Sequence, residues 1–159
     1  SKDNTMGLFS FLKNAGAKVF KSKKPEVAAT EEEKTLQAQE LFDFVKQMGF
    51  DVTGLRVRVE GENVTLGGEV PTQEEKEKII LAIGNVEGVG AVDDNLVVKV
   101  PAPEATFYTV KSGDTLSKIS KEVYANANLY NKIFEANKPM LKDVDHIYPG
   151  QVLRIPVQA

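Results

Sequence analysis

The sequence predicts an α+β protein in which two small domains follow an N-terminal helical segment. The chain has 159 residues, too few for a barrel enzyme but enough for two small cores. Its composition, 42% hydrophobic and 27% charged, is that of a globular protein. Helical and strand-like periodicities alternate along it, and a proline-containing stretch divides the pattern. We therefore expect a helical segment over residues 6–24, a first domain over 25–100, a linker over 101–105 and a second domain over 106–157.

The first segment places its apolar residues on one face of a predicted helix, because their spacing follows the helical period. Gly16 lies inside this pattern and favours a break there. Two interpretations are open: a helix docked on the following domain, which we expect, or a helix on a membrane surface, where its lysines would attract anionic lipid. The apolar residues are Leu8, Phe9, Leu12, Ala15, Val19 and Phe20.

This segment is a poor secretory signal. Lys13 interrupts its apolar run, and most of the basic residues follow the run instead of preceding it. The longest apolar run of the chain is also far shorter than the roughly 20 residues that a spanning helix needs. We therefore expect a cytoplasmic protein without a transmembrane segment.

Residues 30–100 predict a helix, a hairpin, a second helix and a last strand. A capping box of Thr30 and Glu33 begins the first helix, and apolar residues alternate with polar ones on both arms of the hairpin. A second capping box begins the next helix, which ends at Gly84 before a glycine-rich turn and the last strand. This order gives a small sheet with both helices on one face.

Two stretches of this domain match a known pattern. They are Val64-x-Leu66-x-Gly68-x-Val70 and, after the second helix, Val86-x-x-Val89-x-x-Val92-x-x-x-Leu96. With the glycines and both caps, they resemble the BON domain, which occurs in bacterial envelope and stress proteins. The resemblance implies the order αββαβ.

The second domain predicts a strand, two helices and a final strand. It carries Tyr108-Thr-Val-Lys-Ser-Gly-Asp-Thr-Leu116, Ile133-x-x-x-Asn137 and Ile147-x-Pro-Gly-Gln-x-Leu-x-Ile-Pro156. These motifs resemble the LysM domain throughout. The resemblance implies the order βααβ and a groove for N-acetylglucosamine polymers such as peptidoglycan. Carried onto this sequence, the groove comprises Gly113, Asp114, Thr115, Leu116, Ile147 and Pro149.

Composition argues against catalysis and against nucleic acid as a partner. There is no cysteine, and the single histidine, His146, excludes any site with several histidine ligands. Adjacent strand residues point to opposite faces, so Asp93 and Asp94 should not converge on one ligand. An enzyme that cleaves glycans would need a paired acid and base, which we cannot place. Residues 25–105 carry a net charge of −10, which would repel a polyanion and attract a cation.

The whole arrangement is more specific than either domain. A short basic N-terminus that begins Met6-Gly-Leu-Phe, one BON domain, a Pro-Ala linker and a terminal LysM domain together resemble the Kbp family of bacterial BON-LysM potassium-binding proteins. The resemblance implies a cytoplasmic K⁺ sensor, monomeric and without catalytic activity, that prefers larger alkali cations to Na⁺. It also implies that the LysM domain packs against the BON domain and that the chain becomes more compact when it binds K⁺.

Main-chain oxygens suit this ion, because neutral carbonyls can replace the water shell of the large, weakly hydrated K⁺. Helix ends and glycine-rich turns supply carbonyls without helical partners. Carrying the family's carbonyl site onto this sequence gives six ligands: Leu12, Ala15, Ala17, Gly84, Val86 and Val89. The alternative function is a peptidoglycan-binding envelope protein that holds murein fragments through LysM and lipid or protein through BON.

Overall fold

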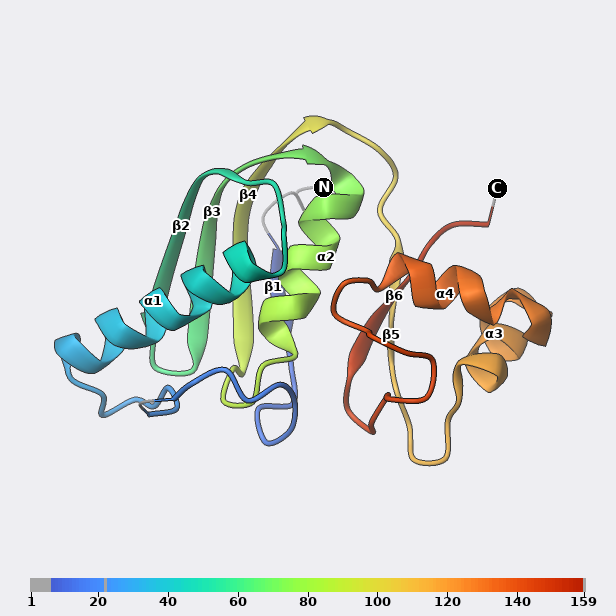
Figure 1. Ribbon diagram of the computed structural model, residues 1–159, viewed down its shortest axis with the longest axis horizontal. Helices are drawn as coiled ribbons and strands as arrows, with labels where there is room; N and C mark the ends of the chain where they lie inside the picture. Colours follow the sequence, from blue (N-terminus) through green and yellow to red (C-terminus); the bar gives the residue numbers. More distant parts are fainter. Residues whose placement is uncertain (1–6, 22, 159) are drawn as a thin grey trace.

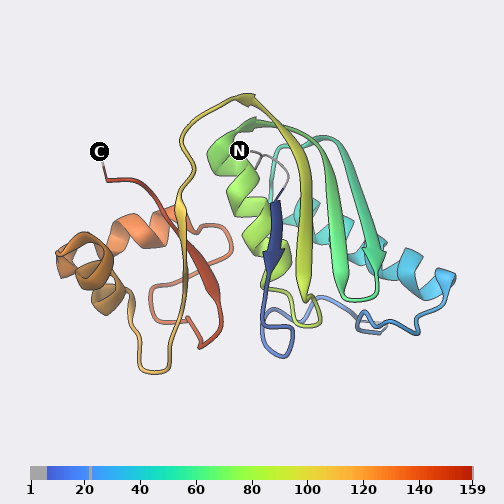
Figure 2. The same cartoon turned by 180° about the vertical axis from the view of Figure 1, so that it is seen from behind.

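The computed structural model describes residues 7–21 and 23–158, which form two α+β units side by side (Figure 1). In the first unit a four-stranded sheet is covered on one face by two helices, and Figure 2 shows its other face without a helix. The second unit is smaller and has a two-stranded sheet. Within the described ranges, no helix combines the length and the apolarity that crossing a membrane requires.

The first unit follows the predicted order of helix, two strands, helix and strand. Thr30 caps its first helix with the reciprocal capping box to Glu33, as predicted. Strands β2 and β3 form the antiparallel hairpin, whereas β3 and β4 run parallel because α2 crosses over between them. The elements are α1 (Glu31–Gln47), β2 (Thr53–Glu60), β3 (Asn63–Thr72), α2 (Gln73–Gly84) and β4 (Ala91–Val100).

The prediction of an N-terminal helix is wrong. Residues Gly7–Ser10 form strand β1, which pairs antiparallel with β4 at the edge of the sheet and gives the strand order β1-β4-β3-β2. The open edge of β4 offers hydrogen bonds that a short helix would forgo. Gly16 also has φ +129°, which is not helical. The amphipathic membrane-surface helix is therefore absent from the described residues.

The expectation that this segment docks on the first domain is confirmed, although as an edge strand and loop. Phe9, Phe11, Val19 and Phe20 pack against the buried core. Leu8 and Leu12, which the helical pattern placed on the same inward face, are 68% and 50% exposed. Alternate side chains of β1 point to opposite faces, and Leu12 lies in the loop beyond the strand, so the helical face is not kept.

The second unit has the predicted order of strand, helix, helix and strand, with a 3₁₀ turn before the second helix. Thr115 caps the first helix by accepting a hydrogen bond from Lys118 N at 3.1 Å. The unit has its own core, which includes Leu116, Ile119 and Leu153. Its elements are β5 (Thr106–Thr109), α3 (Leu116–Tyr124), η1 (Ala127–Leu129), α4 (Tyr130–Ala136) and β6 (Val152–Ile155).

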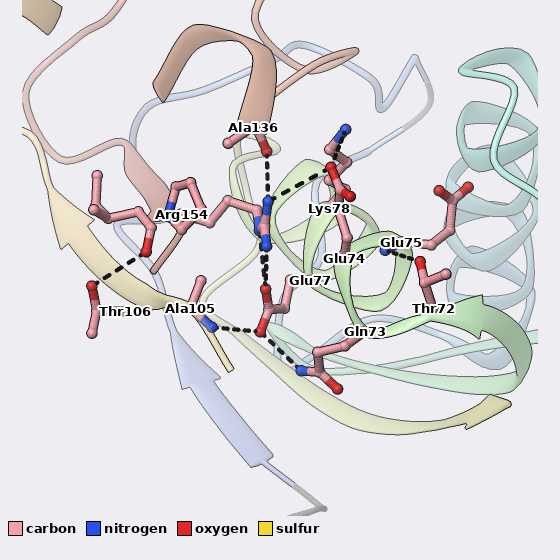
Figure 3. Close-up of polar contacts among 12 residues, drawn as sticks. Thr72, Gln73, Glu74, Glu75, Glu77, Lys78, Ala105, Thr106, Ala136 and Arg154 are labelled. Atoms are coloured by element: carbon pink, nitrogen blue, oxygen red, sulfur yellow. Dashed lines mark hydrogen bonds and ion pairs between the residues drawn. The ribbon is translucent and has the colours of Figure 1, made fainter. Parts of the chain in front are cut away.

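A buried ion pair joins the two units, which confirms the expected contact between the domains (Figure 3). Glu77 Oε1 on α2 accepts hydrogen bonds from Arg154 Nε at 3.0 Å and Arg154 Nη2 at 2.7 Å on β6. The other carboxylate oxygen of Glu77 accepts from Gln73 Nε2 at 2.8 Å and from Ala105 N at 3.0 Å. One carboxylate thus connects α2, the interdomain linker and β6.

Candidate ion-binding site

The six predicted ligand residues fall in two segments that lie against each other. We call them the N-terminal loop (residues 11–18) and the α2–β4 turn (residues 84–90). Ala17 and Val86 also form an isolated parallel bridge. The main chains of the two segments are joined by hydrogen bonds from Phe11 N to Gly90 O at 2.9 Å, Ala17 N to Asn85 O at 2.9 Å, Glu87 N to Ala17 O at 2.9 Å and Gly88 N to Lys13 O at 2.7 Å.

Four of the six main-chain oxygens accept no hydrogen bond from a described residue. They belong to Leu12, Ala15, Gly84 and Val89. The Ala17 oxygen accepts from Glu87 N, and the Val86 oxygen accepts from Val89 N at 3.1 Å, so each keeps one lone pair. Gly84 is the last residue of α2, where helical carbonyls run out of partners. Both segments therefore supply neutral oxygen donors.

Two glycines allow this close approach. A Cβ atom on Gly16 would lie 2.0 Å from Asn85 O, and one on Gly84 would lie 2.0 Å from the ring of Phe11. Neither distance is compatible with a side chain, so the N-terminal loop can reach the turn only across glycines. The sequence predicted a helix break at Gly16, whereas the structure has no helix there and Gly16 instead permits the contact with Asn85.

The acidic side chains around the two segments are already paired. Glu87, within the turn, contacts Lys18 Nζ and Lys24 Nζ, each at 3.2 Å. The hydrogen bond from Lys24, followed by that from Lys18, lowers the pKa of Glu87. Lys13 in the N-terminal loop pairs with Glu62. Among residues 7–21 and 23–158, no cluster of three or more His, Asp or Glu side chains could hold a metal ion.

Asp93 and Asp94 do not converge, in agreement with the prediction. The carboxylate of Asp94 is buried and lies 3.0 Å from Lys76 Nζ, whereas Asp93 is partly exposed. Burial raises the pKa of Asp94, and a hydrogen bond from Leu96 N opposes this shift. The described donors therefore suit a monovalent cation held by carbonyls better than a divalent ion held by carboxylates.

Sequence reasoning missed the part that Asn85 plays. This residue is 6% exposed and caps the end of α2, and its side chain reaches the second domain. Its position between two predicted ligand residues, Gly84 and Val86, indicated a place in the site. Its contact with the second domain had no such signal, because the partner on β6, Val152, is 67 residues away in the chain. Tyr148, in the loop before β6, donates a hydrogen bond from its hydroxyl to Asn85 O at 3.3 Å.

The predicted glycan groove consists largely of residues with structural roles. Asp114 accepts from Tyr108 Oη at 2.7 Å and from Lys111 N at 2.8 Å, and the latter bond lowers the pKa of Asp114. Thr115 caps α3 and Leu116 is buried in the core. Gly113 has φ +86° in the turn before α3. Across the groove, Ile147 packs partly on the same core and Pro149 is exposed.

Comparison with known proteins gives matches over both units. The BON domain model matches residues 33–100, and the LysM domain model matches residues 108–156. A protein of Escherichia coli O6:H1 (strain CFT073) named "Potassium binding protein Kbp" is 49% identical over 152 residues, which cover 95% of this chain and 99% of that protein. An uncharacterized protein of Deinococcus radiodurans is 37% identical over 107 residues, which cover 60% of this chain and 42% of that protein.

Proposed function

The chain belongs to the Kbp family of BON-LysM proteins, and we propose that it binds K⁺ between the N-terminal loop and the α2–β4 turn. The proposed ligands are the main-chain oxygens of Leu12, Ala15, Ala17, Gly84, Val86 and Val89. The observation that carries the proposal is that two segments, held together by hydrogen bonds, carry four carbonyls that accept no hydrogen bond from the described part of the chain. Potassium is the cargo of this site, and no catalytic activity is proposed.

The charge distribution around the segments supports a large monovalent ion. Neutral carbonyls can replace the weak hydration of K⁺, whereas smaller and harder cations need carboxylates that compensate their dehydration. Glu87 and Glu62 are each engaged by lysines. We therefore expect K⁺ and Rb⁺ to bind better than Na⁺ and Li⁺.

Binding is proposed to act as the sensing step in the cytoplasm. The ion bridges a segment that precedes the BON domain to a turn inside it, so it favours the conformation in which the two are joined. At one hundred times its dissociation constant, a ligand stabilises the bound form by about 2.7 kcal/mol. That is enough to shift a segment of marginal stability from an open to a closed population, which makes the monomeric chain more compact.

The test is a titration of the full chain with KCl, RbCl, NaCl and LiCl by calorimetry, in a buffer of matched ionic strength without alkali ions. Thermal melts and small-angle scattering in the same salts report stabilisation and compaction. Heat of binding and a raised Tm with K⁺ and Rb⁺ only are the expected results. Equal midpoints in all four salts, or a stronger response in a parallel titration with MgCl₂, would contradict the proposal.

The match of residues 108–156 to the LysM model supports a second candidate, an envelope protein that binds peptidoglycan. In that function the BON domain contacts lipid or protein. Cosedimentation of the chain with purified murein tests it. Binding to murein without any response to K⁺ would favour this candidate over the first.

A further inference from the structure

Asn85 is the point at which the N-terminal loop, the α2–β4 turn and the second domain meet. Its main-chain oxygen accepts from Ala17 N at 2.9 Å and from Tyr148 Oη at 3.3 Å. Its side chain is directed at strand β6. Nδ2 donates to Val152 O at 2.9 Å, and Oδ1 accepts from Val152 N at 3.0 Å. The carboxamide therefore pairs with the Val152 main chain in both directions, as a neighbouring strand would.

Asn85 also sets the direction in which the carbonyl of Gly84, a proposed ligand, points. The carbonyl of Gly84 and the N–H of Asn85 belong to one planar peptide unit. That N–H donates to Leu81 O at 2.9 Å, and Nδ2 donates to the same oxygen at 2.9 Å. Fixing the Asn85 side of the unit also fixes the Gly84 carbonyl, because the unit turns as a whole. On the other side of Asn85 lies Val86, the next proposed ligand.

A separate contact links the N-terminal loop to the second domain. A Cβ atom on Gly150 would lie 2.3 Å from Leu12 Cδ2, so the Leu12 side chain sits directly against the Gly150 main chain. Leu12 is itself a proposed ligand residue. Both segments of the proposed site therefore touch the stretch 148–152, which runs through the turn before β6 into the strand.

We infer that Asn85 is a positioning residue of the proposed ion site, and that its carboxamide makes the main chain of β6 part of the scaffold that holds the carbonyl ligands. The inference rests on the proposed K⁺ binding and adds to it how the LysM domain contributes. Coupling of this kind is reciprocal, so K⁺ binding also strengthens the contact between Asn85 and Val152.

The experiment compares four full-length proteins: wild type, Asn85→Ala, Tyr148→Phe and Phe107→Leu. The last is a matched control, because Phe107 joins the domains through the ring of Phe9, at a centroid distance of 5.4 Å, and Phe9 lies on β1, outside both segments of the proposed site. For each protein, K⁺ and Na⁺ affinities are measured by calorimetry and Tm is measured without either ion. The ratio of the two affinities is the decisive readout, since a general loss of stability would not change it.

Asn85→Ala is expected to weaken K⁺ binding about tenfold or more and to lower the K⁺/Na⁺ affinity ratio. Tyr148→Phe removes one hydrogen bond to the turn and is expected to weaken K⁺ binding about threefold. Phe107→Leu should stay within about twofold of wild type, because the ring contact that it alters is with Phe9, outside both segments of the proposed site. If Asn85→Ala does not fold, the Tyr148→Phe and Phe107→Leu pair decides the matter.

An affinity ratio in Asn85→Ala equal to that of wild type overturns the inference. Where that variant does not fold, equal losses in Tyr148→Phe and Phe107→Leu overturn it. Either result leaves the proposed function intact, because the wild-type protein still binds K⁺. Absence of K⁺ binding in the wild-type protein is a different outcome, and it removes the proposed function together with the inference.

Discussion

Replacing Glu77 by glutamine removes the negative charge from the buried contact between the two domains (Figure 3). In the wild-type protein the Glu77 side chain is 3% exposed and that of Arg154 is 8% exposed. All four hydrogen bonds to the Glu77 carboxylate come from N–H donors. The glutamine amide would have to turn its own NH₂ group toward one pair of these donors.

The cost follows from the partner that is left behind. Without Glu77, the guanidinium of Arg154 keeps Ala136 O at 3.3 Å and the exposed Glu74 carboxylate at 3.9 Å. Removing one member of a buried ion pair typically costs about 3–5 kcal/mol. For a chain of this size each kcal/mol shifts Tm by roughly 2–4 °C, so we expect a decrease in Tm of about 6–20 °C.

Urea unfolding and thermal melts of Glu77→Gln measure the loss, with Glu74→Gln as the matched control. Glu74 approaches the same arginine, but its side chain is 57% exposed, so its loss should cost at most about 1 kcal/mol. The double variant Glu77→Leu, Arg154→Met should recover most of the stability, because an apolar pair leaves no buried charge. A loss in Glu77→Gln no larger than that in Glu74→Gln would show that the buried pair does not stabilise the interface.

Three further predictions concern the site and its surroundings. Gly16→Ala puts a Cβ 2.0 Å from Asn85 O, so titration should show K⁺ binding weakened about tenfold or more; Gly49→Ala, also at a positive φ but with open space around it, should bind as wild type does. Burial raises the pKa of Tyr148 to about 12, so the stability that its neutral hydroxyl contributes is present below pH 10 and is lost as the pH rises toward 12. In an alkaline absorbance titration, Tyr148→Phe should remove one tyrosine that ionises at unusually high pH. The lysine partners of Glu87 lower its pKa from the ordinary 4.5, so the stability that Glu87 contributes is present above pH 4.5 and is lost as the pH falls through the lowered pKa. Glu87→Gln should therefore make Tm depend less on pH in the acidic range.

The elements that sequence reasoning predicted correctly are those whose signals are local. Thr30 and Glu33 are three residues apart, and the capping box that they form depends on nothing else in the chain. The alternation in the hairpin and the LysM motifs are of the same kind. Strand β1 lacks such a signal, because its partner residues Ala91–Asp94 are more than eighty positions away. The apolar residues of 7–10 satisfied a helical pattern equally well, and only the open edge of β4 decides between the two.

The candidate site shows the same limit more sharply. Main-chain ligands leave almost no trace in side-chain identity, so the six residues came from a family resemblance and not from their own chemistry. Their two segments do lie together, because Gly16 and Gly84 permit it. The contribution of Asn85 could not be seen from the sequence, since its partner Val152 is brought to it by the docking of a separate domain.

Helix α2 is the element through which the domain contact and the candidate site act on each other. Glu77 lies within it and Asn85 is its C-cap, about 12 Å further along the helix axis, and both bind strand β6, at Arg154 and Val152 respectively. Only the second of these contacts involves the turn that carries the Gly84 carbonyl. Loss of the Glu77 pair should therefore lower the stability of the interface more than the ion affinity of the folded chain. Loss of the Asn85 carboxamide should lower the ion affinity more than the stability of the interface. Two substitutions, one within α2 and one at its C-cap, thus separate the energy that holds the domains together from the energy that positions the ligands.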